Sequence, residues 1–198
     1  MNALKTRTLQ AGHWLAWIAV FALSYSQAPL FTSNQNQYFL KGLAHAGWGT
    51  LRLDWLVTRR DSTPVFSWFV EWSYRLIGHE EIYYVVYALL LGIYLFSLLG
   101  ILEHIFPIKT KRQQQFTLAL IVVLHSAFTR AVLSRVLGVD WGYLLEGGWA
   151  GQRVLGSVLQ PSSIGVLILL SLRLFLNKRY FWAVVLLPLA ATVHPTYL

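Results

Sequence analysis

The stretch IYYVVYALLLGIYLFSLLGILEHI, residues Ile82–Ile105, decides the fold class of this chain. Apart from Glu103 and His104, its side chains are uncharged and most of them are apolar. A helix needs about 20 mostly apolar residues to cross the hydrocarbon core of a bilayer. Pro107 and the basic run KTKR follow closely, as is typical of a helix that stops at a membrane surface. The stretch therefore predicts a transmembrane helix.

The composition of the whole chain agrees with a membrane protein. Of its 198 residues, 56% are hydrophobic and 12% are charged, whereas soluble domains carry about 25% charged residues. The net charge of +8 does not indicate nucleic-acid binding, because the basic residues sit at the ends of apolar runs rather than in one patch. The absence of cysteine excludes disulfides, cysteine-ligated zinc and a thiol nucleophile.

Several apolar runs are long enough to be spans. We expect transmembrane helices at 9–28, 82–105, 115–137, 162–177 and 180–197. The dense basic clusters then fall on one side, which the positive-inside rule makes cytoplasmic. The predicted fold is an all-α integral membrane protein of about five transmembrane helices. Residues 1–198 form one polytopic domain, which can be the N-terminal part of a longer protein. We expect it in a bacterial-type cytoplasmic membrane, with the N-terminus in the cytoplasm and the lipid bilayer as its environment.

Two long segments, 29–81 and 138–161, then lie outside. The first contains two predicted surface helices, NQNQYFLKGLAHAG and TPVFSWFVEWSYRLIG. Thr63 suits the N-cap of the second helix and Pro64 its first position. Its apolar positions recur at helical spacing, and its many aromatic residues favour the headgroup layer. We therefore expect this helix to lie in the membrane plane. The apolar face is formed by Val65, Phe69, Trp72 and Leu76.

Asp54 and Asp61 are the carboxylates closest to these two helices. Such a pair can bind a divalent cation, or one member can take a proton from an acceptor hydroxyl. The alternative is an ion-pair cluster with Arg52, Arg59 and Arg60 that holds the loop at the headgroups. The spacing does not decide between these interpretations, and no other residues predict a metal site.

Arg130 and Arg135 lie in the outer half of the third predicted span, where an arginine is costly. Together with Arg153 they can bind phosphate oxygens through forked hydrogen bonds. Alternatively, the helix ends near Thr129 and both arginines reach the headgroups. Gln160 and His194 each precede a proline at an outer helix end, where they either line a cavity or belong to ordinary helix-end turns.

This layout resembles the N-terminal part of the GT-C membrane glycosyltransferases. That family moves a sugar from a polyprenyl-phosphate carrier to an acceptor outside the cytoplasmic membrane. The stretch LDWLVTRRDSTPVFSW is similar to the family's Asp-Trp, basic turn, proline and aromatic helix. The resemblance implies a polyprenyl-phosphate-linked sugar as substrate and places Asn34 and Asn36 at the substrate site. Where the family usually carries its catalytic acid, this chain has Asn and Gln, and an amide cannot act as a general base.

Three functions remain open. The first is a GT-C-like glycosyltransferase, or an inactive relative, in which Asp54 or Asp61 supplies the carboxylate. The second is a transporter or flippase component for an anionic lipid or solute, and the third is a non-enzymatic membrane subunit. Serine-hydrolase, zincin and dinucleotide-binding motifs are missing from the sequence.

Overall fold

The computed structural model describes residues 2–25, 27–148 and 152–197. The protein is 74% helical, and no strand occurs in that part of the chain, so the predicted all-α fold is confirmed. The helices are α1 (Asn2–Ser24), α2 (Gln35–Tyr38), α3 (Leu40–Ala46), α4 (Pro64–Ile77), α5 (Ile82–Ile105), α6 (Lys111–His125), α7 (Ala127–Leu137), α8 (Trp141–Glu146), α9 (Val166–Leu176) and α10 (Tyr180–Val193). Short 3-10 turns are η1 (Leu51–Leu53), η2 (Trp55–Thr58), η4 (Pro161–Gly165) and η5 (Pro195–Tyr197).

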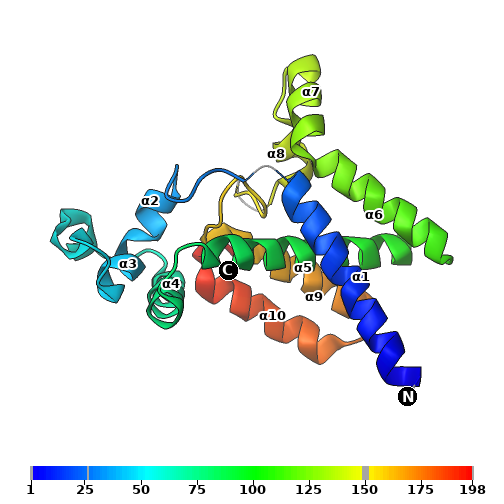
Figure 1. Cartoon of the computed structure of the whole chain (residues 1–198), viewed down its shortest axis with the longest axis horizontal. Helices are drawn as coiled ribbons and strands as arrows, with labels where there is room; N and C mark the ends of the chain where they lie inside the picture. Colours follow the sequence, from blue (N-terminus) through cyan, green and yellow to red (C-terminus); the bar gives the residue numbers. More distant parts are fainter. Residues whose placement is uncertain (1, 26, 149–151, 198) are drawn as a thin grey trace.

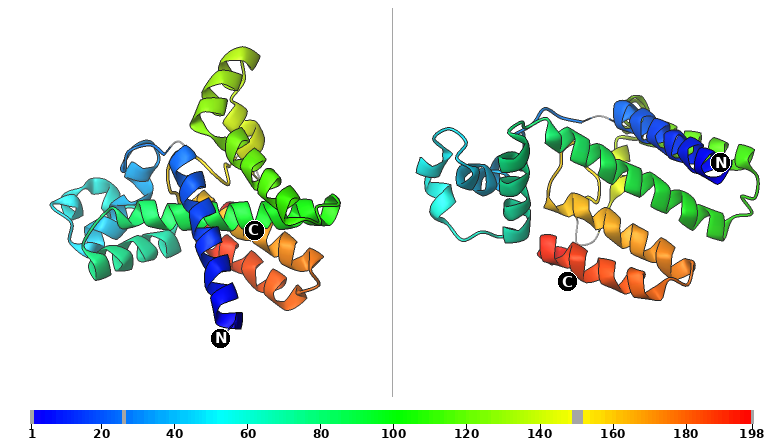
Figure 2. Two further views of the ribbon diagram at one scale, coloured as in Figure 1. Left: turned by 45° about the vertical axis from the view of Figure 1, so that its right-hand side comes forward. Right: turned by 60° about the horizontal axis from the view of Figure 1, so that its bottom comes forward.

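Helix α5 is the centre of the fold. It packs against α1 on one side and α9 on another, and α10 packs against α9 (Figures 1 and 2). Leu91 and Leu95 of α5 are fully buried. Gly92 permits the close approach of α1, since a Cβ atom there would lie 2.7 Å from Ile18 Cδ1. The stretch that predicts a membrane span is therefore also the helix around which the others are arranged.

Only α5 is both long and apolar enough to cross a membrane by itself among the described residues. The predicted span at 115–137 is not one straight helix, because α6 and α7 are bent by 58° at Ser126. Ser126 has an extended backbone with ψ 150, and its hydroxyl accepts the Thr129 N–H at 3.2 Å. This serine ends α6 and caps α7. The remaining apolar helices are shorter, so the count of five spans stays a prediction.

The long helices alternate in direction, so their connections gather at two ends. The start of α1, the α5–α6 turn and the α9–α10 turn lie at one end, which carries Lys109, Lys111, Lys178 and Arg179 (Figures 1 and 2). The segments 27–81 and 152–165 lie at the other end. We call this second end the loop end. Residues 149–151 of the predicted loop 138–161 lie outside the described residues.

A helical layer covers the loop end. It contains the second predicted surface helix as α4, whereas the first is divided at Phe39 into α2 and α3. Thr63 is the N-cap residue of α4 and Pro64 its first residue, as predicted. Gly42 lets α3 pack closely on α4, since a Cβ atom there would lie 2.5 Å from the Ser67 carbonyl oxygen. Helix α4 is seen almost end-on in Figure 1 while α5 runs across the picture, so the two are nearly perpendicular.

Candidate functional site

A hollow of about 250 Å³ opens in the layer at the loop end. We call it the loop-end hollow. It lies where the start of α4 meets α2, α3 and η2. Its lining combines one carboxylate with three basic side chains and several hydroxyl and amide groups. The lining residues are Gln37, Tyr38, Leu40, Lys41, Leu56, Arg59, Arg60, Asp61, Ser62 and Thr63.

Asp54 and Asp61 are both held by local backbone hydrogen bonds. Asp61 Oδ1 accepts the Thr63 N–H at 2.9 Å, just before α4 begins. Asp54 Oδ1 accepts the Leu56 N–H at 2.8 Å and caps η2. Of the two carboxylates, Asp61 alone lines the loop-end hollow. The other carboxylate oxygen of Asp61, Oδ2, can therefore accept a hydrogen bond from a hydroxyl group placed in the hollow.

The basic residues near these carboxylates make other contacts. The Lys41 ammonium group donates to the Arg59 carbonyl oxygen, which ties α3 to the turn after η2. The Arg59 guanidinium lies 5.3 Å from the centroid of the Trp55 ring, a cation–π distance. Within the described ranges, no ion pair joins Arg52, Arg59 or Arg60 to Asp54 or Asp61. The predicted ion-pair cluster is therefore not what fixes this loop.

Asn34 and Asn36 are exposed at the start of α2, and the Asn34 side chain makes no capping bond. The buried amide between them is Gln35, which is 1% exposed. Gln35 Oε1 accepts the Phe31 N–H at 2.7 Å, and Nε2 donates to the Leu159 carbonyl oxygen at 2.9 Å. Gln35 thus connects the first loop segment to the second. The sequence did not indicate this role, because Gln35 stands between two other polar residues, Asn34 and Asn36.

A buried polar cluster lies behind this layer, where α1 ends and α7 meets α8. We call Tyr25, Arg130 and Glu146 the buried triad. The Tyr25 hydroxyl donates to Glu146 Oε1 at 2.6 Å, and Arg130 Nη2 forms an ion pair with the same oxygen. Arg130 also donates to the Tyr25 hydroxyl at 3.3 Å. Gly142 leaves room for the Arg130 side chain, because a Cβ atom at residue 142 would collide with the guanidinium group.

Glu146 is the most enclosed acid of the described residues, with 1% of its side chain exposed. Burial raises the pKa of Glu146, and the Tyr25 hydrogen bond and the Arg130 charge oppose that shift. Its second oxygen, Oε2, is buried and has no hydrogen-bond partner among the described residues. A half-satisfied buried carboxylate depends strongly on its one cationic partner.

The three predicted phosphate-binding arginines have different surroundings. Arg130 belongs to the buried triad, Arg153 pairs with Asp140, and Arg135 is exposed on α7. Burial opposes the ionisation of Asp140, but the Tyr143 N–H bond and the Arg153 side chain together hold its pKa below the usual value. Two of the three guanidinium groups thus neutralise carboxylates of this chain, as in structural ion pairs.

Gln160 and His194, predicted at two helix ends, lie near one short turn. The Gln160 N–H donates to Ser163 Oγ at 3.3 Å within η4. The His194 ring is 6% exposed and lies 5.4 Å from the Tyr197 ring, while the Tyr197 hydroxyl donates to the Ser162 carbonyl oxygen at 2.6 Å. The structure therefore brings the end of α10 onto η4, beside a mainly apolar hollow of about 400 Å³.

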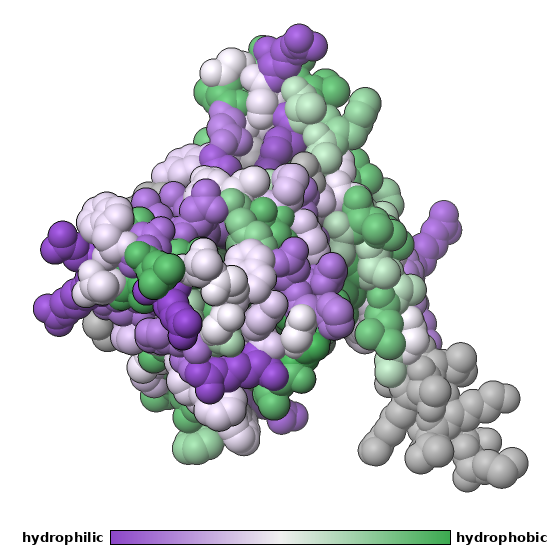
Figure 3. Space-filling view, turned by 60° about the vertical axis from the view of Figure 1, so that its left-hand side comes forward, coloured by the Kyte–Doolittle hydropathy of each residue, from purple (hydrophilic) through white to green (hydrophobic). Residues whose placement is uncertain are grey.

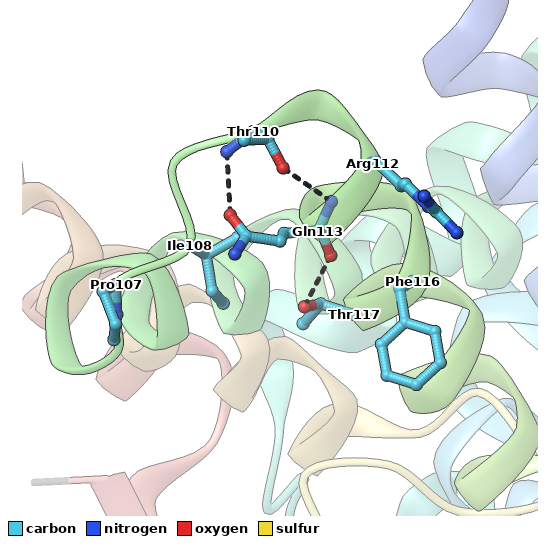
Figure 4. Close-up of a pocket in the computed structure, with 7 residues that line it drawn as sticks. All are labelled: Pro107, Ile108, Thr110, Arg112, Gln113, Phe116 and Thr117. Carbon is cyan, nitrogen blue, oxygen red and sulfur yellow. Dashed lines mark hydrogen bonds between the residues drawn. The ribbon is translucent and has the colours of Figure 1, made fainter.

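A larger hollow, of about 550 Å³, lies at the opposite end of the molecule, on the α5–α6 turn. Figure 4 shows that Thr110, Gln113 and Thr117 bond to one another in this turn, whereas Arg112 makes no bond to the residues drawn. The Thr110 hydroxyl accepts the Gln113 N–H at 3.2 Å, and Gln113 Oε1 accepts the Thr110 N–H at 2.9 Å. These groups form a capping box that starts α6.

The described residues contain no group of three or more His, Cys, Asp or Glu side chains that could hold a metal ion. The loop-end hollow is thus the place where a carboxylate, cations and hydroxyl groups meet. No protein-family model matches the chain, and neither a curated protein nor a solved structure matches it.

Proposed function

We propose that the chain is a membrane protein that transfers a sugar from a polyprenyl-phosphate carrier at the loop end, in the manner of a GT-C glycosyltransferase. In this proposal α1, α5, α6 with α7, α9 and α10 cross or enter the bilayer, and the loop end faces away from the cytoplasm. The single observation that carries the catalytic part is the place of Asp61 in the loop-end hollow beside Lys41, Arg59 and Arg60.

The exposed side chains of the long helices support the membrane part. Within α10 the buried residues are three alanines, whereas Phe181 is 71%, Trp182 57% and Val184 64% exposed. Soluble monomers rarely expose continuous apolar patches of more than a few hundred Å². Figure 3 looks at the loop end, whose near face is largely hydrophilic, while a hydrophobic flank follows the helix at the right. This division suits a bilayer around the helices and water at the loop end.

Helix α10 is shorter than a full membrane span. Its 14 residues extend about 21 Å at 1.5 Å per residue, whereas the bilayer core is about 30 Å thick. Helix α10 packs on α9, and α9 packs on α5. Side-by-side packing on a full-length span keeps both shorter helices at bilayer depth. The basic residues Lys178 and Arg179, in the turn between them, then reach the headgroups.

In the proposed reaction, the acceptor hydroxyl oxygen forms a bond to the anomeric carbon of the sugar. The bond from that carbon to the phosphate oxygen breaks, and the polyprenyl phosphate leaves with the electron pair. Asp61 takes the hydroxyl proton, and Lys41 and Arg60 attract the phosphate charge. Asp54, which caps η2 outside the hollow, has the weaker claim to this role.

The orientation can be tested first, because the chain has no native cysteine. Ser62 is exposed and lines the loop-end hollow. The variant Ser62→Cys should react with a membrane-impermeant maleimide in intact cells. The matched control is Lys109→Cys, exposed in the α5–α6 turn, which should react only after permeabilisation. The opposite pattern would place the hollow in the cytoplasm and rule out the proposed reaction.

The catalytic role needs a separate test. Membranes that contain the protein are supplied with radiolabelled nucleotide sugars, from which they make lipid-linked donors, and incorporation into acceptor is measured. Asp61→Asn should abolish the transfer that depends on this protein while membrane insertion is retained. Asp54→Asn is the matched control, since it also removes a carboxylate that caps a backbone N–H. Equal activity of wild type and Asp61→Asn would remove Asp61 from the mechanism.

One observation favours a non-enzymatic subunit as the second candidate. Both carboxylates accept backbone N–H groups at helix starts, which by itself is a structural task. A subunit would show the labelling pattern described above, but no transfer would depend on either carboxylate.

A further inference from the structure

We propose that the turn between α5 and α6 binds one anionic phospholipid, with the lipid phosphate at Arg112 and an acyl chain along the outer side of α6. This inference rests on the membrane part of the proposed function but not on its chemistry. The site lies at the end of the molecule opposite to the loop-end hollow, so it is separate from the proposed reaction.

A hollow marks the place of the lipid headgroup. Its volume is about 550 Å³, within the range of about 300–1,000 Å³ that is typical of small-molecule sites. Its apolar lining comes from Pro107, Ile108 and Phe116, and Arg112 is the one charged side chain among the described residues that line it. An apolar wall beside a single cation suits a molecule that carries both an anionic group and a hydrocarbon chain.

The positive charge of this turn is not neutralised by the protein. Lys109, Lys111 and Arg112 are exposed, and no ion pair among the described residues involves any of them. Glu103 is the one acid in the sequences of α5, α6 and α7, and its Oε1 accepts a hydrogen bond from Gln114 Nε2 at 2.8 Å. Three cations against one acid leave the turn positive, and a positive turn attracts the phosphate of an anionic lipid.

Thr110 provides a second hydrogen-bond donor beside Arg112. Its hydroxyl oxygen accepts the Gln113 N–H at 3.2 Å, and this capping bond does not use the hydroxyl proton. Figure 4 shows Arg112 without a bond to the other residues drawn, so its guanidinium N–H groups are available as well. A phosphate in the hollow can therefore accept hydrogen bonds from both side chains.

An uncovered apolar ridge continues from Arg112 along α6. Phe116 is 70%, Leu120 47% and Val123 56% exposed, and their spacing places them on one side of the helix. The buried side of α6 packs on α1 and α5. From residue 112 to residue 123 the helix rises about 16.5 Å at 1.5 Å per residue, which is about half of the bilayer core of about 30 Å. The ridge thus matches the depth of one leaflet, where an acyl chain would lie.

The other turn at this end of the molecule provides a control. Lys178 and Arg179 lie between α9 and α10, and Arg179 is exposed like Arg112. Arg179 does not line the hollow on the α5–α6 turn. A general attraction to anionic membranes would depend on both arginines alike, whereas a lipid held in the hollow depends on Arg112.

The experiment uses the full chain in phosphatidylcholine vesicles with a trace of photoactivatable phospholipid. This lipid carries a diazirine on one acyl chain and has either a phosphatidylglycerol or a phosphatidylcholine headgroup. After illumination, mass spectrometry of proteolytic fragments locates the cross-links. Residues 116–123 report the proposed site, and residues 181–189 of α10 report general lipid contact, since Phe181 is 71% and Leu189 49% exposed.

The expected result is that phosphatidylglycerol labels residues 116–123 severalfold more than phosphatidylcholine does, while both label residues 181–189 alike. Arg112→Gln should lower the phosphatidylglycerol labelling of residues 116–123 about fivefold, the factor for one basic side chain at an anionic lipid. Arg179→Gln should leave it unchanged. Both arginines are exposed, so the two variants should fold like wild type, which circular dichroism checks.

Equal labelling of residues 116–123 by the two lipids would overturn the proposed site. Equal losses in Arg112→Gln and Arg179→Gln would also overturn it, because they would indicate only a general surface attraction. Either result, with residues 181–189 still labelled, leaves the membrane part of the proposed function intact. No labelling of residues 181–189 by either lipid would remove the bilayer from α10 and overturn both proposals.

Discussion

Removal of the Arg130 side chain should strongly destabilise the protein. Arg130 is the one cation paired with Glu146 in the described part of the chain. The variant Arg130→Ala leaves a carboxylate that is 1% exposed with the Tyr25 hydroxyl as its remaining partner. Glu146 must then either stay ionised without a counter-charge or take up a proton.

The expected loss of folding stability follows from how deeply Arg130 and Glu146 are buried. Breaking a buried ion pair by removing one member costs about 3–5 kcal/mol. The Arg130 side chain is 19% exposed, so some solvent reaches the pair, and we expect the lower end, about 3 kcal/mol. A domain of about 200 residues loses about 2–4 °C of melting temperature per kcal/mol. The expected shift is therefore about 6–12 °C.

The assay is thermal unfolding of the purified protein in detergent, followed by circular dichroism. The matched control is Arg153→Ala, which removes the same side chain from the Asp140 pair. That pair is 32% and 47% exposed, and exposed pairs contribute about 0.2–1 kcal/mol. A second control is the double variant Arg130→Met with Glu146→Leu. It should recover most of the lost stability, because apolar replacement of a buried pair is often neutral.

The stability deficit of Arg130→Ala should also depend on pH, in a direction that the pKa of Glu146 determines. Burial already raises the pKa of Glu146, and the loss of Arg130 raises it further. A group whose folded pKa is raised contributes stability at low pH that is lost as the pH rises through that pKa. The deficit of Arg130→Ala should therefore shrink as the pH is lowered. Equal shifts for Arg130→Ala and Arg153→Ala, unchanged with pH, would refute the description of Glu146 as a buried charge.

Two other predictions concern the loop end. Gly42→Ala should push α3 away from α4, because the new Cβ atom would lie 2.5 Å from the Ser67 carbonyl oxygen. Overpacking of this kind costs about 1–3 kcal/mol of folding stability. Limited proteolysis should therefore cut the layer at the loop end faster than in wild type. Burial alone would raise the pKa of Asp140, but the Tyr143 N–H bond and the Arg153 side chain together lower it. Asp140 therefore contributes stability above its unfolded pKa of about 3.9 and loses that contribution as the pH falls through the lower folded pKa. Asp140→Asn should accordingly be less stable than wild type at neutral pH, and the difference should shrink as the pH falls below about 4. A constant difference in thermal unfolding would contradict this.

Local features of the structure could be predicted well from the sequence. Helix α5 was predicted at 82–105 with the bounds that the structure has, because a long apolar run has few other ways to satisfy its backbone. The start of α4 at Thr63 and Pro64 was equally readable, since capping and proline preferences act within a few residues. The bend at Ser126 was missed, because the apolar pattern continues through it and an ordinary serine gives little sign that it caps a new helix.

The contents of the candidate site depended on tertiary structure. Arg130 was singled out from its cost in an apolar helix, but nothing in the sequence pairs it with Glu146 or with Tyr25. The Tyr25–Glu146 bond joins residues 121 positions apart, and the Gln35–Leu159 bond joins residues 124 apart. Likewise, Asp54 and Asp61 looked equivalent until the packing of α3 and η2 put Asp61 alone in the loop-end hollow.

The helical class, the central apolar helix and the start of α4 could be predicted from the sequence alone. These follow from hydrophobic periodicity and from hydrogen bonds between near neighbours, which a few adjacent residues specify. Only the tertiary structure decided which carboxylate faces the hollow, which cation neutralises the buried Glu146 and which side of α4 is left apolar and exposed. Those features depend on where distant segments meet, because a buried charge or an uncovered tryptophan is defined by its neighbours in space rather than by its neighbours in the chain.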